Sequence, residues 1–309
     1  MSKMKILLTG ATGFVGRNIK PVLEQKYDVI GVGSEYDLRY PFHANEMLAF
    51  NDADVVVHAA GTVGGIQANK DNPGKFIYDN LSMGMNLIEA CRVFRIKKFI
   101  LLGTVCSYPK HCKVPFNEKD LWLGYPEETN APYGIAKNTL MQMVMSYNKQ
   151  YGFNGVNLIP VNMYGPHDHF NLTSSHVIPA LILKFYNAVK NNEKEVVVWG
   201  TGRATREFLY APDLAYAIDS AIQRDVPSNP INIGTGREIR IVDLVTEIAD
   251  KMGYAGSIRF DSSKPDGQPR RRLNTDLAEE LLNFKANTNL NDGLQTTIEW
   301  FKKNADTII

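Results

Sequence analysis

Tyr133 and Lys137 are the residues of this chain whose types and spacing most clearly suggest chemistry. They form a Tyr-x-x-x-Lys pair in a stretch with a helical pattern, so both side chains project from one helix face, about 6 Å apart along the axis. A phenol with a reference pKa near 10 is a weak acid at neutral pH, but a neighbouring ammonium group stabilises phenolate and lowers that pKa. The pair predicts a tyrosine that donates a proton, although the same spacing also occurs on ordinary helix surfaces.

Thr104 strengthens this interpretation. It follows the apolar run 99–103, which we expect to form a strand that ends there. Ligands of open α/β sheets bind at the carboxyl ends of the strands. The combination of Thr104, Tyr133 and Lys137 therefore predicts a catalytic site at that edge of a sheet.

A glycine-rich turn, Gly10-Ala11-Thr12-Gly13-Phe14-Val15-Gly16, follows the first predicted strand and opens a helix. Glycines allow the backbone to turn tightly and to approach a pyrophosphate, while the free N–H groups at the helix start stabilise its negative charge. His58-Ala59-Ala60-Gly61 ends a later predicted strand, where small residues leave room for a dinucleotide. A plain glycine turn is the alternative, but the position between strand and helix favours a nucleotide cofactor.

The end of the second predicted strand should distinguish the two nicotinamide cofactors. An acidic residue there binds the ribose 2′-OH of NAD, whereas an arginine accommodates the 2′-phosphate of NADP. Ser34 could hydrogen-bond either form, Glu35 favours NAD, and Arg39 is the nearest cation. These residues leave the choice between NAD(H) and NADP(H) open.

The hydrophobic pattern predicts an α/β protein, because short apolar runs alternate with amphipathic stretches as in a parallel sheet with helical crossovers. We expect a Rossmann-type doubly wound parallel sheet with a smaller, interleaved C-terminal substrate lobe. The predicted dinucleotide-binding domain covers residues 1–161 and about 207–231, and the predicted nucleotide-sugar-binding lobe covers 162–206 and 232–309. Pro21 falls inside the first predicted helix, 15–25, where we expect an irregularity. The predicted strands are 5–9, 29–32, 55–58, 98–102, 155–159, 196–199 and 258–261, and the further predicted helices are 74–94, 133–151, 241–252 and 290–304.

Composition narrows the class of partner. The chain has 34 Lys and Arg against 33 Asp and Glu without a long run of one sign, which gives no electrostatic reason to expect nucleic acid or a membrane surface. No apolar run approaches the roughly 20 residues that span a bilayer, and the first residues lack a signal-peptide pattern. Cys91, Cys106 and Cys112 lack the spacing of a zinc or redox site. We expect a cytoplasmic protein with reduced thiols, no metal and a small-molecule substrate.

The chain resembles the extended short-chain dehydrogenases/reductases, and within them the GDP-L-fucose synthase branch. The segments that carry the resemblance run from near residue 6 to about residue 270 in the family's order, and several are peculiar to this branch. They are 59–61, 64–69, 106–110, 132–137, 162–168, 175–181, 199–202, 206–209 and 263–267.

The resemblance implies an NADP(H)-dependent enzyme that epimerises C3 and C5 of a GDP-4-keto-6-deoxy sugar and reduces C4. The 4-keto group acidifies the protons at C3 and C5, and Cys106 and His176 stand at the family's acid–base positions. In the reduction, Tyr133 would protonate the C4 oxygen and Thr104 would hydrogen-bond it. Lys137 would tune Tyr133 and bind the nicotinamide ribose. A lone Cys or His is more often structural, but here the two occur together in matching motifs.

The resemblance also implies which residues hold the two ligands. Arg206 suits a bidentate contact with phosphate, although Trp199 and Arg206 could equally be packing and surface residues. We expect a homodimer as well. The cofactor residues would be Gly10, Thr12, Gly13, Phe14, Val15, Gly16, Ser34, Ala59, Ala60, Gly61, Leu102, Lys137, Pro160, Asn162, Met163 and His176. The GDP-sugar residues would be Asn162, Lys184, Trp199, Arg206 and Asp266.

The chain departs from the family's pattern in ways that affect both ligands. Thr104-Val105-Cys106 replaces Ser-Ser-Cys and keeps the hydroxyl group. In the family, two arginines bind the 2′-phosphate; this chain has Thr12 at the first of these positions and Ser34 at roughly the second. At the nucleotide sugar, Lys184 replaces an arginine of the family. The cofactor preference and the sugar therefore stay open, and a related GDP-4-keto sugar such as a heptose is an alternative substrate.

Other functions compete with this interpretation. A C4-reductase that does not epimerise is one alternative, and a non-catalytic NAD(P)-binding protein is another. The intact Thr104, Tyr133 and Lys137 argue against the binding protein. A 4,6-dehydratase of the same fold would place an Asp-Glu pair where this chain has Val105-Cys106.

Overall fold

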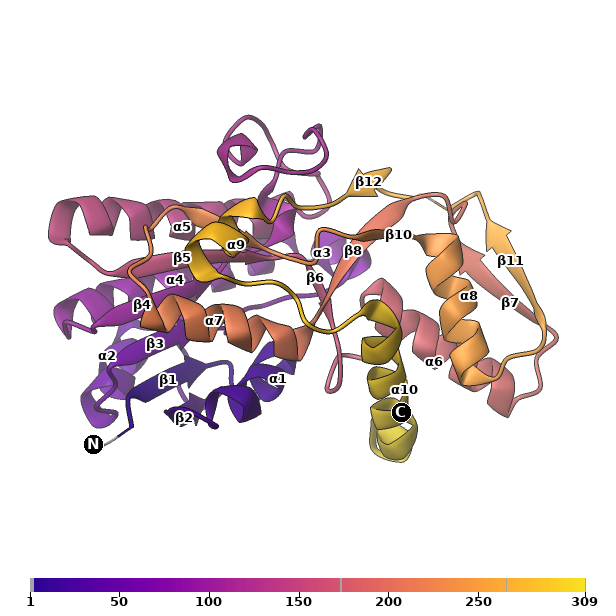
Figure 1. The fold of residues 1–309 in the computed structure, drawn as a ribbon, viewed down its shortest axis with the longest axis horizontal. Helices are drawn as coiled ribbons and strands as arrows, with labels where there is room; N and C mark the ends of the chain where they lie inside the picture. The colour runs from indigo at the N-terminus through magenta and orange to yellow at the C-terminus, as the bar shows by residue number, and fades with distance from the viewer. Residues whose placement is uncertain (1–2, 173, 265, 309) are drawn as a thin grey trace.

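The computed structural model describes residues 3–172, 174–264 and 266–308, which form a larger and a smaller part (Figure 1). Within these residues, the larger part contains a six-stranded sheet in the order β2-β1-β3-β4-β5-β9, with every neighbouring pair parallel. The order reverses between β1 and β3, where ligands bind in sheets of this kind. The strands are β1 (Lys5–Thr9), β2 (Asp28–Val32), β3 (Val55–His58), β4 (Lys98–Leu102), β5 (Gly155–Pro160) and β9 (Pro230–Ile233).

Helices cover both faces of this sheet (Figure 1). On one face α1 (Phe14–Leu23) packs against α7 (Leu214–Gln223), with α9 (Asp276–Leu282) beside α7. On the other face α4 (Pro73–Val93) lies between α2 (Pro41–Phe50) and α5 (Ala131–Tyr151). Because both faces are covered, the central strands β3 and β4 are buried along their whole length.

The smaller part has its own hydrophobic core, which includes Phe185 and Phe301. In it, β8 pairs with β6, β10 and β12, and β7 pairs with β11. The helices are α6 (Val177–Lys190), α8 (Ile241–Met252) and α10 (Leu290–Ile308). The strands are β6 (Asn162–Tyr164), β7 (Glu195–Trp199), β8 (Thr205–Tyr210), β10 (Glu238–Arg240), β11 (Ser257–Asp261) and β12 (Arg270–Arg271). Connecting turns include α3 (Ile66–Asp71) and the 3₁₀ helices η1 (Val105–Ser107), η2 (Glu118–Asp120) and η3 (Ala211–Asp213).

The predicted α/β class with a doubly wound parallel sheet is confirmed. α1 contains Pro21 and ends at Leu23, two residues before the end that the sequence pattern indicates. The domain boundaries stay a prediction. One part of the predicted lobe, 232–309, packs differently from the rest: Leu273 and the buried residues of α9 belong to the hydrophobic core of the larger part.

The buried carboxylate of Glu207, on β8, connects segments of both parts. It accepts hydrogen bonds from the backbone N–H groups of Thr235 (2.6 Å), Gly236 (2.8 Å) and Leu273 (2.7 Å). Burial raises the pKa of Glu207, and these three donors act in the opposite direction. Three donors around one carboxylate allow the charge to be buried, and they fix β8, the loop after β9 and the segment after β12 relative to one another.

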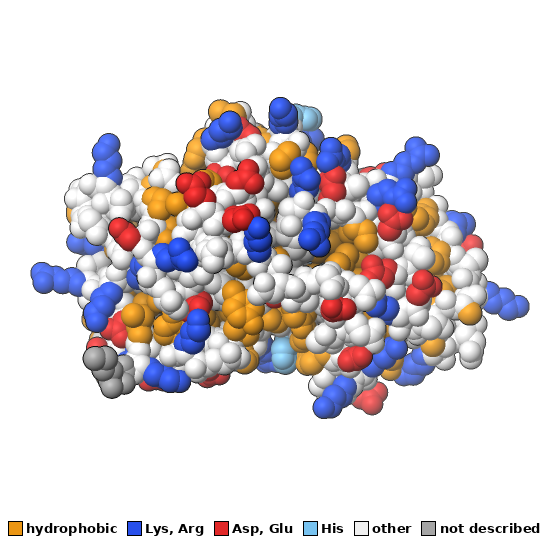
Figure 2. All heavy atoms as spheres, viewed as in Figure 1, with side chains coloured by type: hydrophobic (Ala, Val, Ile, Leu, Met, Phe, Trp, Pro, Cys, Tyr) orange, Lys and Arg blue, Asp and Glu red, His pale blue; other side chains and the backbone are white. Residues whose placement is uncertain are grey.

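The surface is mixed in charge. Figure 2 shows Lys and Arg side chains interspersed with Asp and Glu over the face in view. Among the described residues, no helix is long and apolar enough to cross a membrane, and no group of three or more His, Cys, Asp or Glu is arranged to hold a metal ion. The cytoplasmic location stays a prediction.

Candidate active site

The glycine turn after β1 meets the end of β3 at the point where the strand order reverses. Gly10 has φ +70°, and a Cβ there would lie 2.7 Å from the backbone nitrogen of Ala60. A Cβ at Gly16 would overlap the carbonyl oxygen of Gly10. Only glycine allows both approaches, and Gly13 lies between them with its N–H bonded to the Gly10 oxygen at 3.0 Å. The turn therefore has the close-packed form that admits a dinucleotide pyrophosphate at the start of α1.

In dinucleotide-binding sheets of this kind the residues after the second strand contact the adenosine ribose, and here they include the carboxylate of Glu35. Glu35 Oε1 accepts the N–H of Gly33 at 2.7 Å, and a Cβ at Gly33 would lie 2.9 Å from Thr12 Oγ1 and 3.0 Å from Glu35 Oε2. Ser34 is exposed beside them. The side chains of Glu35 and Thr12 therefore both lie against Gly33, directly after β2.

Two arginines lie in this region. The Arg39 guanidinium is held by Asp37 at 2.7 and 2.8 Å and by Asp79 at 3.4 Å, so its charge is already paired. The sequence did not single out Arg17, an exposed residue whose Nε donates to the Thr12 carbonyl at 2.8 Å. Its position one residue after the last glycine of the turn was the available signal.

Thr104, Tyr133 and Lys137 are brought together by β4 and α5. Thr104 lies two residues after the end of β4 and caps η1, with its Oγ1 accepting the N–H of Cys106 at 3.2 Å. Tyr133 and Lys137 lie in the first turns of α5. Lys137 Nζ donates to the carbonyl of Leu102 at 3.0 Å and lies 6.0 Å from the centroid of the Tyr133 ring. The strand end and the helix start thus face each other as the sequence predicts.

The electrostatics of this group differ from the prediction. The sequence predicts that Lys137 lowers the pKa of Tyr133, but desolvation and the neighbouring Cys106 raise it, while the Thr104 hydroxyl acts in the opposite direction. Burial lowers the pKa of Lys137 itself to about 8. This prediction is wrong for two reasons. The Lys137 ammonium group donates to the Leu102 carbonyl. The spacing of Tyr133 and Lys137 in the sequence also contains no information about how far the phenol is desolvated.

Cys106 and His176, the two predicted acid–base residues, both lie near Arg271. Cys106 is partly buried in η1, and Arg271 Nη1 lies 3.7 Å from its Sγ. His176 immediately precedes α6, where part of the residue reaches the surface while protein atoms surround its ring. Desolvation by surrounding protein atoms lowers the pKa of His176, and the charges of Arg271 and His169 add to this effect. Arg271 was missed at the sequence level, because only its place in the run Arg270-Arg271-Arg272 marked it.

Arg206 and Asp266 lie side by side among the predicted GDP-sugar residues. Arg206 Nη2 donates to the backbone carbonyl of Asp266 at 3.1 Å, while the Asp266 carboxylate accepts the N–H and hydroxyl of Thr201, each at 2.6 Å. Desolvation and the nearby Arg271 lower the pKa of Arg206 to about 10, although Asp266 and Cys106 act in the opposite direction. Arg206 therefore keeps its positive charge at neutral pH.

The other predicted ligand residues come from several elements. Trp199 is 64% exposed at the end of β7, with Lys264 Nζ 5.4 Å from its ring centroid. Lys184, on α6, donates to the Val197 carbonyl at 2.7 Å, and burial lowers its pKa. Asn162 Nδ2 donates to the Glu207 carbonyl at 3.0 Å. Pro160 ends β5, Met163 lies on β6, and Pro265 of the motif 263–267 lies outside the described residues.

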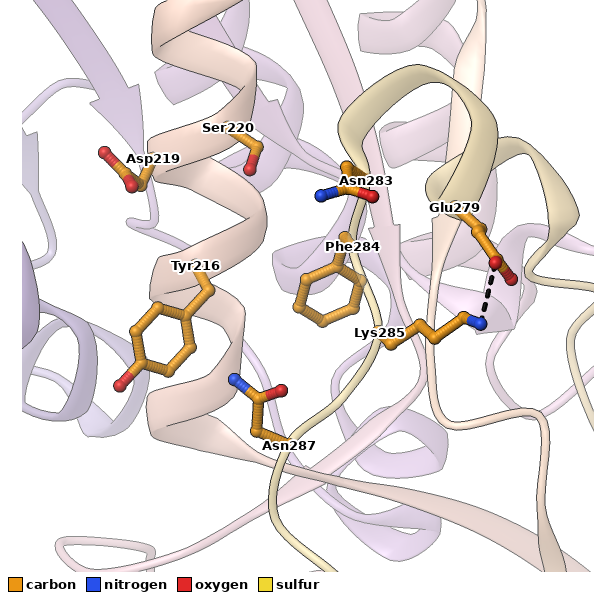
Figure 3. Close-up of a pocket in the computed structure, with 8 residues that line it drawn as sticks. All are labelled: Tyr216, Asp219, Ser220, Glu279, Asn283, Phe284, Lys285 and Asn287. Carbon is orange, nitrogen blue, oxygen red and sulfur yellow. Dashed lines mark ion pairs between the residues drawn. The ribbon is translucent and has the colours of Figure 1, made fainter.

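A separate pocket of about 340 Å³ lies between α7 and the segment that contains α9 and the residues after it (Figure 3). Tyr216 and Asp219 border it from α7, and the ion-paired Glu279 and Lys285 border it from the other side. None of the predicted site residues lines this pocket.

Comparisons with known proteins agree with the geometry. GDP-L-fucose synthase of Escherichia coli (strain K12) is 39% identical to this chain over 318 residues, covering 99% of each chain. A GDP-L-fucose synthetase from Naegleria fowleri bound to NADP has a TM-score of 0.91 at 28% identity, covering 99% of this chain and 96% of its own. A GDP-6-OMe-4-keto-L-xylo-heptose reductase from C. jejuni has a TM-score of 0.90 at 26% identity, covering 98% of this chain and 99% of its own.

Residues 6–234 match the family described as the NAD dependent epimerase/dehydratase family. This match spans more than half of the chain, and it includes the glycine turn, Thr104, Cys106, Tyr133 and Lys137. The resemblance seen in the sequence is thereby confirmed, and the chain belongs to the NAD dependent epimerase/dehydratase family.

Proposed function

We propose that this protein is an NADP(H)-dependent enzyme that epimerises C3 and C5 of a GDP-4-keto-6-deoxy sugar and reduces C4, as a GDP-L-fucose synthase does. The observation that carries the proposal is the place of Cys106: its backbone N–H donates to the Thr104 hydroxyl, and its thiol lies close enough to Tyr133 to act on that phenol electrostatically. A plain reductase needs only the hydroxyls and Lys137, whereas a thiol at the same place adds a group that can move protons at carbon. The full-length relative named GDP-L-fucose synthase supports this assignment.

In the reduction, the chain supplies a proton and holds the carbonyl. Tyr133 donates its phenolic proton to the C4 oxygen, and the Thr104 hydroxyl hydrogen-bonds the same oxygen. Lys137, held by the Leu102 carbonyl with its Nζ 6.0 Å from the centroid of the Tyr133 ring, offers a positive charge near the phenolate as it forms and a donor for the nicotinamide ribose. NADPH, when bound, supplies the hydride that C4 accepts.

In the epimerisation, Cys106 and His176 act on opposite faces of the sugar. A C–H bond at C3 or C5 breaks, its proton passes to one of the two groups, and its electron pair moves toward the C4 oxygen as an enolate. The other group then delivers a proton to the opposite face of the same carbon, which inverts its configuration. Thr104 and Tyr133 stabilise the enolate oxygen by hydrogen bonding.

The close-packed glycine turn fits a dinucleotide, and we assign Gly10, Gly13 and Gly16 to its pyrophosphate. For the GDP-sugar we assign the diphosphate to Arg206, which is charged and partly buried, with Lys184 as a second cation. Trp199, exposed at a strand end, offers a ring face to the base or sugar, and Asn162 and Asp266 offer polar groups.

One alternative has a specific observation in its favour. The structural similarity to a GDP-4-keto-heptose reductase, together with Lys184 in place of the family's arginine, favours a C4-reductase that acts on a related GDP-4-keto sugar. In that case Cys106 and His176 would be pocket residues without a role in proton transfer.

Replacing Tyr133 with phenylalanine tests the reduction. Tyr133→Phe should abolish C4 reduction of GDP-4-keto-6-deoxymannose while leaving NADPH affinity within about threefold, because only the proton donor is removed. Stopped-flow oxidation of NADPH and fluorescence titration measure the two quantities. Tyr151→Phe, at the exposed end of the same helix, is the matched control. Reduction by Tyr133→Phe at the wild-type rate would contradict the assignment.

Solvent exchange separates the epimerase-reductase from the plain reductase. In deuterated water the wild-type protein should incorporate deuterium at C3 and C5, and Cys106→Ser and His176→Asn should each suppress this at least about a hundredfold, since general acid–base groups contribute rates of that order. NMR of the product measures the exchange. Cys112→Ser and His111→Asn are the controls, because both residues lie outside the proposed site. Reduction without deuterium at C3 or C5 would establish the reductase alternative.

The cofactor preference should be weaker than two 2′-phosphate arginines would produce. Because Glu35 and Thr12 occupy that place, we expect a kcat/KM for NADPH less than a thousandfold above that for NADH, equivalent to about 4 kcal/mol. Glu35→Gln should raise the NADPH preference about tenfold by removing a repulsive charge. Glu299→Gln, on α10, is the control. A wild-type ratio above a thousandfold would mean that another cation, such as Arg17, binds the 2′-phosphate.

The homodimer is part of the same proposal. Tyr78 (61% exposed) and Met85 (42% exposed) lie one heptad apart on α4, and such apolar side chains on an outer helix suit a twofold contact with a second copy. Light scattering should give twice the chain mass of 34.6 kDa. The double variant Tyr78→Lys, Met85→Lys should give a single chain, unlike the control Phe42→Lys on α2. A wild-type monomer at micromolar concentration would disprove the dimer.

A further inference from the structure

We propose that Arg271 is a positioning residue that fixes the direction of the Cys106 side chain and stabilises the thiolate form in which its sulfur reacts. The inference deepens the proposed function and rests on it, because Cys106 must act as a base in the epimerisation. A thiol removes a proton from carbon only as the thiolate, and a neighbouring cation stabilises that form. Arg271 Nη1 lies 3.7 Å from Cys106 Sγ.

The guanidinium of Arg271 is oriented by a chain of hydrogen bonds. Its Nε and Nη2 donate to Gln268 Oε1 at 3.0 and 2.7 Å, which leaves Nη1 directed at the sulfur. Gln268 is itself held, because its Nε2 donates to the Lys110 carbonyl at 2.7 Å. Lys110 and Cys106 belong to the same segment after β4, so Gln268 couples Arg271 to the segment that carries the thiol.

The charge of Arg271 is available to the sulfur. Within the described part of the chain, no carboxylate forms an ion pair with Arg271, and the side chain that holds it, Gln268, is neutral. The adjacent Arg270 differs, because it forms a surface ion pair with Glu238. Arg271 therefore carries an unneutralised positive charge next to Cys106, whereas the charge of its neighbour is balanced.

Arg271 does not exchange the proton itself. A guanidinium stays protonated throughout the pH range of a folded protein, so it acts only through its charge and its hydrogen bond. The step that it supports is the transfer of a sugar C–H proton to the Cys106 sulfur, with the electron pair of the C–H bond moving toward the C4 oxygen. His176, in its protonated imidazolium form, then delivers a proton to the other face of the carbon and becomes neutral. Two further titratable side chains, Tyr133 and Arg206, interact electrostatically with the Cys106 sulfur.

The test uses the substrate-free, full-length protein and a neutral alkylating reagent. We expect Arg271→Gln to slow alkylation of Cys106 by iodoacetamide at pH 7.0 at least tenfold, with the modified peptide quantified by mass spectrometry. Arg271→Lys, which keeps the charge, should recover most of the rate. Arg270→Gln removes the same charge from the adjacent residue and should leave the rate unchanged. A rate for Arg271→Gln within twofold of wild type would overturn the proposal.

A second variant avoids removing the arginine. Gln268→Glu is nearly isosteric, keeps an acceptor for Arg271 and adds a carboxylate that would neutralise its charge. Alkylation of Cys106 should slow at least threefold in Gln268→Glu. An unchanged rate in this variant would overturn the electrostatic role even if Arg271→Gln proved unstable.

Deuterium exchange separates the failure of this inference from the failure of the proposed function. With GDP-4-keto-6-deoxymannose in deuterated water, Arg271→Gln should lose exchange by a factor similar to its loss of alkylation rate, and Arg270→Gln should not. If the wild-type protein incorporates no deuterium while alkylation still depends on Arg271, the epimerase function is disproved and the Arg271–Cys106 coupling is upheld. If exchange is present and alkylation does not respond to Arg271, the function is upheld and this inference is disproved.

Discussion

The buried carboxylate of Glu207 is the interaction on which the arrangement of the site depends. Its three backbone donors, at Thr235, Gly236 and Leu273, come from segments distant in the sequence. Loss of the carboxylate would leave the buried N–H group of Leu273 without this acceptor, at a cost of about 1–3 kcal/mol, and would also remove the acceptor of the two part-buried N–H groups. The strand that carries Glu207 also carries Arg206 and lies in register with Arg271. The Asn162 side chain, on β6, donates to the backbone carbonyl of Glu207, so this residue is hydrogen-bonded to β6, to the loop after β9 and to the segment after β12.

At the cofactor end, the corresponding constraint is the close approach of β1 and β3. Thr9 Oγ1 lies 2.9 Å from Nδ1 of His58 and accepts the N–H of Ala60 at 3.3 Å. Complete burial lowers the pKa of His58 to about 3, so the imidazole is neutral and can be held inside the sheet. This contact fixes the two strand ends that bring Ala60 against Gly10. The glycine turn is therefore shaped by a buried polar pair as well as by the absence of side chains.

The parts of the molecule that local periodicity describes could be predicted, and the parts that depend on long-range pairing could not. β1, β3, β4 and α8 appear as runs of apolar residues with the period of a strand or helix, and the sequence alone places them correctly. β12 has only two residues, and it becomes a strand because it pairs with β8, some 65 positions earlier. Arg271 escaped prediction for the same reason. The predicted direction of the Tyr133 pKa shift is wrong for a related reason, since desolvation depends on neighbours that only the folded chain supplies.

Arg206 and Arg271 place two positive charges close together, an unfavourable arrangement of the kind that is found at functional sites. They are register partners on the adjacent parallel strands β8 and β12, and the nearby charge of Arg271 contributes to the lowered pKa of Arg206. Two cations held together oppose folding, and the nearby Asp266 offsets this only in part, because desolvation and Arg271 together still lower the pKa of Arg206. A thiolate at Cys106 and the diphosphate of a GDP-sugar are the two anions that the proposed chemistry requires at this place. In the proposed function, these two anions would offset the repulsion between the arginines.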